Sequence, residues 1–417
     1  MRVAVVGSGG REHALAEALA STADVVVTPG NPGIPWSTAA PAEELDVDLY
    51  VIGPEVPLVA GLADRLRAAG SLVFGPGADG ARLEGSKAWM KEVLTGAGVP
   101  TAAHRSFRGA QGRDAIEFLK SLPGPYVVKA DGLAAGKGVV VCSTTEDALA
   151  AIDRIMVREE FGRAAGRQVV IEKRLEGQEL SVLALVAGRT IVPLQPTQDH
   201  KAAFDGDTGP NTGGMGAYCP APLATPALLQ DIDTGILVPT VHALKRGRRP
   251  FRGVLYAGLM VTNQGPRVLE FNCRFGDPET QPLLMRLKTD LLDLLEAVVD
   301  DRLGELEETR LEWDPRPAVC VGMASQGYPG SYAKGKVVAG LSEAAKLPGV
   351  KVFHAGTKLE NGLVVTDGGR VLSVTALGET LADARRNAYE AVSRIHFQGA
   401  FYRRDIADRA LAPVTAP

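Results

Sequence analysis

The chain contains Lys129-Ala-Asp-Gly-Leu-Ala-Ala-Gly-Lys-Gly138 and, further on, Glu270-Phe-Asn-Cys-Arg-Phe-Gly-Asp-Pro-Glu-Thr-Gln281. The first stretch follows the apolar residues Tyr126-Val-Val, so a strand ends where a glycine-rich loop begins. Because glycine has no side chain, the glycines at 132, 136 and 138 let backbone amides approach a polyphosphate. The stretch therefore predicts a loop that covers phosphates, with a lysine at the strand end.

The second stretch begins with two polar side chains on an apolar run. Glu270 and Asn272 follow Val268-Leu269, so in a strand their oxygens point to the same face. One carboxylate and one amide oxygen suit Mg²⁺ that also binds nucleotide phosphates. The pattern predicts a magnesium strand; the alternative is a pair of satisfied polar residues on a half-exposed strand.

Composition limits the class of protein. The chain has 417 residues, 45% of them hydrophobic, which is enough for several domain cores. Its net charge of -4 comes from interspersed acids and bases, so we expect small-molecule partners rather than nucleic acid or a membrane surface. The cysteines lack metal-site or disulfide-framework spacing, and we find no signal peptide or long apolar run, which predicts a cytoplasmic protein with reduced thiols.

Strand and helix patterns divide the chain into three parts. Residues 1–84 form an N-terminal α/β unit, with strands at 3–6, 49–52 and 72–74 and helices at 11–19 and 59–69. Residues 85–311 begin with a helix at 86–95 and then divide into two parts. The first, 101–175, has strands at 126–129, 139–142 and 168–172 and helices at 112–121 and 144–157. The second, 176–311, has strands at 180–187, 254–262 and 267–271 and a helix at 291–299. Residues 312–417 form an α+β unit with strands at 319–323, 351–354 and 371–375 and a helix at 381–394.

Two glycine motifs resemble better-known ones but differ from them. The dinucleotide fingerprint needs a third glycine where Glu12 stands, although a strand, glycines and a helix beginning near Arg11 still offer amides to a phosphate. A tight turn without a ligand is the alternative. The 132–138 loop is not a Walker A motif, because Gly138 stands where Ser or Thr would bind magnesium, and its alternative is a flexible hairpin turn.

Two further segments carry polar groups. Glu172 and Glu179 flank a turn at Gly177, where one carboxylate could accept from an adenine amino group and the other from ribose hydroxyls; a solvated charged turn is the alternative. Residues 196–224 show little periodicity and contain Asp199-His-Lys201 and a run of glycines. We expect a long irregular loop there with a functional role, since compact domains rarely keep an idle one; a disordered surface segment is the alternative.

Six further short motifs follow one another along the chain. They are Gly9-Gly-Arg-Glu-His-Ala14, Gly53-Pro-Glu55, Leu83-Glu-Gly-Ser-Lys87, Gln198-Asp-His-Lys201, Thr208-Gly-Pro-Asn-Thr-Gly-Gly-Met-Gly-Ala-Tyr218 and Phe353-His-Ala-Gly-Thr357. In these blocks and the two opening stretches, the chain resembles the phosphoribosylamine-glycine ligases, or glycinamide ribonucleotide synthetases, of the ATP-grasp superfamily. The resemblance covers nearly the whole chain. It implies an ATP-grasp fold with an N-terminal parallel-sheet α/β domain, a mobile ATP lid, a central part and a C-terminal α+β domain.

The resemblance also implies a role for each group of residues. ATP would be bound by Lys87, Lys129, Gly136, Lys137, Gly138, Glu172, Leu175 and Glu179. Glu270 and Asn272 would ligate Mg²⁺ or Mn²⁺. The glycine and sugar-phosphate pocket would be formed by Gly9, Gly10, Arg11, Asn31, Glu55, Asp199, His200, Lys201, Gly213, Gly214, Met215, Arg274, Asp277 and Pro278. Lys129 and Arg274 are the candidate catalytic residues.

The implied reaction is the ATP-dependent ligation of glycine to 5-phosphoribosylamine in purine biosynthesis. A carboxylate reacts with an amine only after activation, because oxide is a poor leaving group, so the expected intermediate is glycyl phosphate. Lysines and Mg²⁺ would neutralise the charge on the transferring phosphoryl group. The expected products are glycinamide ribonucleotide, ADP and phosphate, and we expect a monomer.

Two alternatives stay open. Another ATP-grasp ligase would share the ATP segments but use a different acid or amine, although the 198–201 and 212–215 blocks favour glycine. A non-catalytic nucleotide-binding regulator would keep the fold without substrate-dependent ATP hydrolysis. The chain also departs from the family pattern: residues 31–48 look shortened, which predicts a reduced first sheet, and 255–259 offer no acid for the metal.

Overall fold

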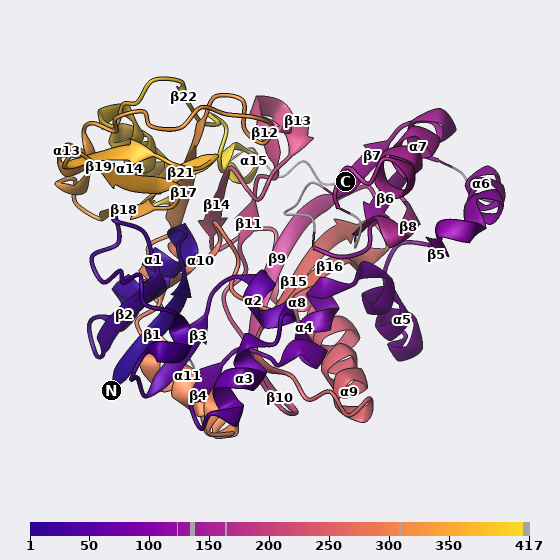
Figure 1. Cartoon of the computed structure of the whole chain (residues 1–417), viewed down its shortest axis with the longest axis horizontal. Helices are drawn as coiled ribbons and strands as arrows, with labels where there is room; N and C mark the ends of the chain where they lie inside the picture. Colours follow the sequence, from indigo (N-terminus) through magenta and orange to yellow (C-terminus); the bar gives the residue numbers. More distant parts are fainter. Residues whose placement is uncertain (123, 134–137, 163–164, 308–310, 412–417) are drawn as a thin grey trace.

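The computed structural model describes residues 1–417 except 123, 134–137, 163–164, 308–310 and 412–417 (Figure 1). Gly136 and Lys137, which we predicted for the phosphate loop, lie outside the described residues.

The N-terminal part is a parallel α/β unit. Its strands are β1 (Arg2–Gly7), β2 (Asp24–Pro29), β3 (Leu49–Ile52) and β4 (Leu72–Phe74), in the order β2-β1-β3-β4. The helices are α1 (Gly10–Leu19), α2 (Glu55–Val59), α3 (Leu62–Ala68) and α4 (Ala78–Gly85). The three predicted strands are confirmed, and β2 is an addition, formed by a valine run that the pattern analysis passed over. The predicted helix at 59–69 is α3 alone, since the chain turns at Gly61, whose φ is +77°.

Helix α5 (Lys87–Ala97) leads to a lobe formed by residues 104–173, drawn in purple at the right of Figure 1. The lobe contains β5 (His104–Arg108), α6 (Gly112–Ser121), β6 (Tyr126–Ala130), β7 (Val139–Cys142), α7 (Thr145–Ile152) and β8 (Gln168–Lys173). Its antiparallel sheet has the order β5-β8-β6-β7. The lobe has its own apolar core, which includes Phe107, Leu119 and Ile171. It is therefore a separately packed body, with the predicted strands in place and β5 added.

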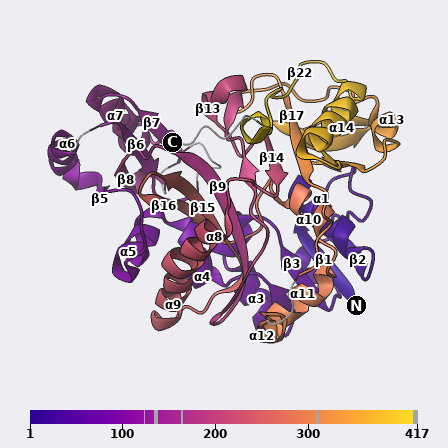
Figure 2. The ribbon, with the colours of Figure 1, turned by 180° about the vertical axis from the view of Figure 1, so that it is seen from behind.

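The central sheet is antiparallel. Its strands are β9 (Gln178–Ala187), β10 (Thr190–Pro193), β15 (Arg252–Thr262) and β16 (Gly265–Asn272), in the order β10-β9-β15-β16. The helices of this part are α8 (Pro226–Ile232), α9 (Val238–Arg246), α10 (Thr280–Arg286), α11 (Leu291–Val299) and α12 (Leu303–Glu307). Helix α11 packs between this sheet and β4, so its leucines are buried on several sides (Figure 2).

The C-terminal sheet draws strands from two distant parts of the chain. The earlier part of the chain contributes β11 (Gln198–Asp199) and β14 (Gly216–Cys219). The strand order is β11-β14-β17-β21-β18, with β22 (Ala400–Phe401) also on β17. The strands β17 (Ala318–Ser325), β18 (Val350–His354) and β21 (Arg370–Leu377) were predicted, as was α14 (Leu381–Arg394). The other elements are α13 (Leu341–Ala345), α15 (Asp408–Leu411) and the hairpin of β19 (Thr357–Glu360) and β20 (Leu363–Thr366).

The prediction of an irregular loop at 196–224 is wrong. This segment contains β11 (Gln198–Asp199), β12 (Ala202–Phe204), β13 (Thr208–Asn211) and β14 (Gly216–Cys219). Strand β14 pairs with β17, so its backbone groups are satisfied by a strand about a hundred residues away in the sequence. Local periodicity carries no sign of such a partner. The segment therefore connects the central sheet to the C-terminal sheet.

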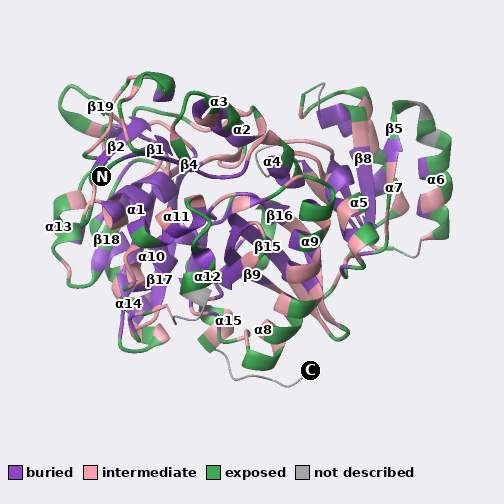
Figure 3. Cartoon of the chain, turned by 90° about the horizontal axis from the view of Figure 1, so that it is seen from below, coloured by how far each residue is buried: buried purple, intermediate pink, exposed green. Residues whose placement is uncertain are grey.

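Burial follows these layers (Figure 3). The strands of the central and C-terminal sheets are mostly buried, whereas the outer helices of the 104–173 lobe are largely exposed. Cys142, Cys219, Cys273 and Cys320 are buried free thiols. Within the described part of the chain, no helix combines the length and apolarity that a membrane span requires.

Candidate active site

The 104–173 lobe meets the central sheet at a cluster of buried charges. The Nζ of Lys129, at the end of β6, lies 3.1 Å from Oε1 of Glu172 on β8. It also donates to the carbonyl of Leu269 at 2.9 Å. Burial acts to raise the pKa of Glu172, but the ammonium groups of Lys129 and Lys91 outweigh it and the net shift is downward. The lobe thus holds a lysine and an ionised carboxylate against β16.

Strand β16 presents Glu270 and Asn272 at this junction. Its register against β15 shifts between Val268 and Glu270, so Leu269 is an extra residue in a β-bulge. Oε1 of Glu270 lies 3.3 Å from Nζ of Lys201, which is also 3.7 Å from Glu179. Lys201, and to a smaller extent Lys129 and Lys87, lower the pKa of Glu270 to about 2 against the effect of burial. The Glu270 carboxylate therefore carries its negative charge at neutral pH.

The start of α5 is tied to the start of the glycine-rich loop. Asp131 accepts hydrogen bonds from the Ala88 amide at 3.0 Å and from the Ser86 hydroxyl at 3.0 Å. Nζ of Lys87 donates to the carbonyl of Gly132 at 3.2 Å. At the other end of the loop, the Gly138 carbonyl accepts from the Ala130 amide at 2.8 Å. Lys87 and both described ends of the loop therefore adjoin Lys129.

Arg274 is the centre of a second charged network. Its guanidinium lies 3.2 Å from Glu55 and 2.8 Å from Glu84, and it donates to Oδ1 of Asn272 at 3.3 Å. Burial acts to lower the pKa of Arg274, but the carboxylates of Glu84 and Glu55 outweigh this effect and the net shift of the pKa is upward. The N-terminal unit thus contributes two carboxylates that fix an arginine at the end of β16.

A third network joins the C-terminal sheet to the 213–214 glycines. Arg370 pairs with Asp277 at 2.9 Å and donates to the carbonyls of Gly213 and Gly214 at 3.1 Å each. Gly214 has φ +115°, and a Cβ there would lie 2.4 Å from Cδ of Pro278. The glycine is thus required both by its backbone conformation and by close packing.

The first glycine turn approaches the same region. Gly10 begins α1, and a Cβ on it would meet the side chain of Gln281 at 2.9 Å. Arg11 is buried, pairs with Glu12 at 2.6 Å and donates to the Phe275 carbonyl at 3.1 Å. Gly9 precedes the helix and donates to Glu12 at 2.7 Å. The Glu12 side chain lies against Gly7 and Gly9, where an added Cβ would come within 2.4 and 2.9 Å of it.

The remaining predicted residues lie around these networks. Asn31 bonds to the Ser8 and Ala355 carbonyls at 2.7 and 3.1 Å. Asp199, His200 and Met215 are buried, whereas Lys201 is half-buried and residues 204–210 are exposed. Burial raises the pKa of Asp199, and His200 accepts a hydrogen bond from the Ala407 amide at 3.1 Å. Leu175 is half-buried in the turn after β8. His200 thus faces the C-terminal segment, whereas Lys201 faces Glu179 and Glu270.

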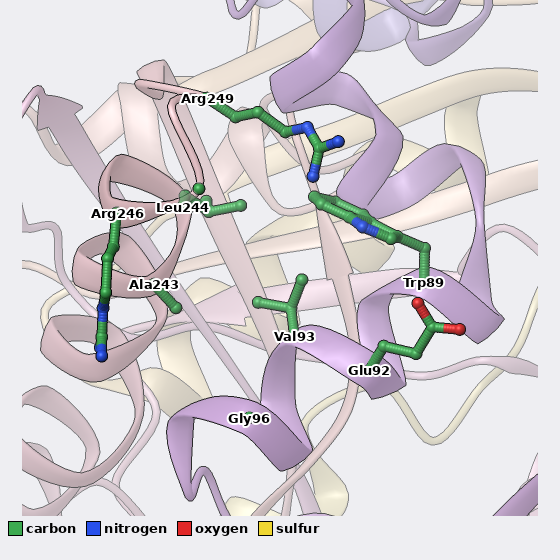
Figure 4. Close-up of a pocket in the computed structure, with 9 residues that line it drawn as sticks. Trp89, Glu92, Val93, Gly96, Ala243, Leu244, Arg246 and Arg249 are labelled. Carbon is green, nitrogen blue, oxygen red and sulfur yellow. The ribbon is translucent and has the colours of Figure 1, made fainter.

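A pocket of about 390 Å³ lies elsewhere, between α5 and α9 (Figure 4). It is lined by Trp89, Glu92 and Val93 from one helix and by Leu244 and Arg249 from the other side. None of the predicted site residues lines it. Helix α5 therefore has two faces, one toward this pocket and one, carrying Lys91, toward the charged junction.

The donors at the junction fit a hard divalent cation. Among the described residues, no cluster of three or more His, Cys, Asp or Glu could enclose a metal. Glu270 and Asn272 supply two oxygens, and Mg²⁺ commonly takes its remaining ligands from nucleotide phosphates and water. The residues therefore fit a metal shared with a nucleotide, not a metal held by protein alone.

Comparison with known proteins agrees with this arrangement. Sequence models of the phosphoribosylglycinamide synthetase N domain, ATP-grasp (A) domain and C domain match residues 1–84, 85–280 and 318–409. A phosphoribosylamine–glycine ligase from Rhodopirellula baltica is 55% identical over 432 aligned residues, covering 98% of each chain. The chain belongs to the phosphoribosylglycinamide synthetase family.

Other members of the phosphoribosylglycinamide synthetase family match over their full length. The ligase from Pseudomonas aeruginosa is 47% identical, covering 99% of each chain. The crystal structure of the phosphoribosylamine–glycine ligase from Thermotoga maritima has a TM-score of 0.81 at 35% identity and covers 98% of this chain and 100% of its own. A biotin carboxylase domain from Hydrogenobacter thermophilus, at 17% identity, covers 96% of this chain and 91% of its own with a TM-score of 0.72, and shares the fold alone. The ATP-grasp fold class is confirmed.

Sequence reasoning missed three charged residues that hold the synthetase site together. Lys91 lies one helical turn after Lys87 among the buried residues of α5, and a lysine within an apolar stripe is the signal that could have found it. Glu84 lies in the Leu83–Lys87 block, but the resemblance to the family assigns it no role. Arg370 pairs with Asp277 across 93 positions of sequence, and nothing in its local sequence indicates this contact.

Proposed function

We propose that the chain ligates glycine to 5-phosphoribosylamine by way of glycyl phosphate, with ATP as phosphoryl donor. The family membership supports the overall reaction. The observation that supports the chemical route is the gathering of three lysines near Glu270: Lys201 pairs with it at 3.3 Å, and Lys129 and Lys87 also lower its pKa. Such a set of cations suits a polyphosphate and a transferring phosphoryl group rather than a nucleophilic enzyme intermediate.

Nucleotide binding rearranges the lysines in this proposal. Lys129 moves from Glu172 to the phosphates, and Lys87 approaches them from the start of α5. Glu172 and Leu175 then bind adenine, while Glu179 binds the ribose. The 132–138 loop closes over the phosphates and excludes water, because an acyl phosphate hydrolyses if water reaches it.

Glu270 and Asn272 would hold Mg²⁺, which neutralises phosphate charge during transfer. Arg274 is the cation next to Asn272 and is fixed by two carboxylates, so it suits the carboxylate of glycine and then the acyl phosphate. The amine attacks the acyl carbon, and phosphate leaves. The positive end of α1 at Gly9 and Gly10 would bind the sugar phosphate, with Asp277 and the 213–214 glycines on its opposite side.

The proposal also covers the organisation of the chain. We assign 1–84 to the substrate domain, 85–311 to the ATP-grasp core and 312–417 to the C-terminal domain; the ranges of the family matches support this division. We assign a monomer in the cytoplasm, where four buried thiols stay reduced. Light scattering of the purified chain tests the monomer.

The test of function measures ADP release with ATP, Mg²⁺, glycine and freshly generated phosphoribosylamine, with each component omitted in turn. The proposal predicts release that needs both substrates and yields ADP rather than AMP. Release with a different acid or amine would point to another ATP-grasp ligase. ATP binding without release in any combination would point to a regulator.

A further inference from the structure

Lys91 occupies a buried position between three elements. Its side chain on α5 is 1% exposed, and Nζ lies 3.0 Å from Oε1 of Glu172 on β8. It also donates to Oγ1 of Thr101 at 2.5 Å, and Thr101 donates to the Val268 carbonyl on β16 at 2.6 Å. Lys91 therefore links α5, the 104–173 lobe and β16.

Glu172 has two lysine partners on one oxygen. Lys129 lies 3.1 Å from the same Oε1 that contacts Lys91. If Lys129 leaves for the triphosphate, Lys91 is the cation that remains, because Thr101 holds it from the other side. His104, the partner of Glu172 on the adjacent strand β5, is a further titratable group near it, and burial is the main cause that lowers its pKa.

The identity of this remaining partner matters for the chemistry of the carboxylate. A buried carboxyl group without a cation becomes protonated more easily, and a protonated carboxyl group can donate. An ionised carboxylate only accepts. The 6-amino group of adenine donates, whereas a 6-oxo purine presents an acceptor at the same place, so an ionised Glu172 favours the first and repels the second.

We propose that Lys91 is a positioning residue that keeps Glu172 ionised and in place once Lys129 has engaged the phosphates, and so sets the preference for adenine over a 6-oxo purine. The inference rests on the proposed ATP site. Lys91 does not touch the nucleotide; it acts through Glu172.

The experiment compares ATP with ITP, which replaces the 6-amino group with a carbonyl. The variants are Lys91→Met, Lys91→Gln, Glu172→Gln and the double variant K91M/E172Q. Lys120→Met is the control, because Lys120 is exposed on the same lobe. We measure kcat and KM in the complete ligase reaction, and calorimetric dissociation constants for ADP and IDP without glycine.

The Lys91 variants are expected to raise KM for ATP about tenfold with kcat changed less than about threefold, and to lower the ATP-to-ITP preference at least about tenfold. In the Glu172→Gln background, adding K91M should change the preference less than about twofold, since the two residues act as a unit. K120M should match the wild type.

A wild-type preference in K91M or K91Q would overturn the proposal, as would an equal loss of preference in the Glu172→Gln background. The amide of K91Q still donates hydrogen bonds to Thr101 and Glu172. This variant is therefore used for the measurement if K91M does not unfold cooperatively. ADP binding is measured independently of ligation. A wild-type chain that binds ADP but does not ligate would refute the proposed function and leave the base preference to be measured from ADP and IDP.

Discussion

Replacing Lys129 is expected to lower the catalytic rate with little effect on the free energy of unfolding. In a Lys129→Met variant the phosphoryl group loses a cation, while Glu172 keeps Lys91 at 3.0 Å and the folded chain gains no unpaired carboxylate. Loss of one preorganised donor to a transition state costs about 10²–10³ in kcat, or about 2.7–4 kcal/mol. Loss of one partner of a buried ion pair costs about 3–5 kcal/mol of stability only when it leaves a charge alone.

We therefore expect kcat/KM for ATP to fall at least about a hundredfold, with a change in the free energy of unfolding below about 1.5 kcal/mol. The assay couples ADP release to an absorbance signal, and urea unfolding gives the stability. Lys120→Met is again the control on the lobe surface. Wild-type turnover would refute the role of Lys129, and equal losses of activity and folding would refute the claim that Lys91 retains Glu172.

Three further variants test other parts of the site. Glu270→Gln should raise the Mg²⁺ concentration needed for half-maximal rate at least about tenfold, measured by metal titration. Because Lys201 lowers the pKa of Glu270 to about 2, below the usual 4.5, the stability that this ionised carboxylate adds is present above pH 4.5 and lost as the pH falls toward 2. The stability difference between wild type and E270Q in metal-free urea titrations should shrink over that window; a constant difference would contradict the pairing. Gly214→Ala should lower stability by about 1–3 kcal/mol, because its Cβ would lie 2.4 Å from Pro278 at a φ of +115°; an unchanged melting curve would contradict this packing. Ser86→Ala removes the cap of α5 and should cost about 1 kcal/mol while raising KM for ATP, because Ser86 also donates to Asp131 at the start of the glycine-rich loop; an unchanged KM would argue against that second role.

Long periodic segments were predictable from the sequence. Helices at 291–299 and 381–394 match α11 and α14, because their apolar stripes are set by local spacing and packing. Strand β14 was not predictable, because its four residues become a strand only by pairing with β17. Strand pairing between distant segments is a tertiary effect that local patterns do not encode.

The same distinction holds for the site. Residues in glycine-rich or alternating patterns, such as Lys129 and Glu270, could be proposed from local sequence. Arg370 could not, because its partner Asp277 lies in another part of the chain. For Lys91, the apolar stripe marks a buried lysine but does not reveal its partner Glu172 on β8. The direction of His200 was equally hidden: its ring meets Ala407, far along the chain. Most of the ion pairs at this site join side chains from different elements. Local sequence therefore indicates the residues within motifs, but not the residues that pair with them.

The most direct test of the central claim uses glycine labelled with ¹⁸O in its carboxylate. Attack of that carboxylate on the γ-phosphorus moves one glycine oxygen onto the phosphoryl group, and the amine then releases it as phosphate. Mass spectrometry of the phosphate from a complete reaction should therefore show one ¹⁸O per turnover. Unlabelled phosphate together with glycinamide ribonucleotide would contradict the glycyl phosphate route.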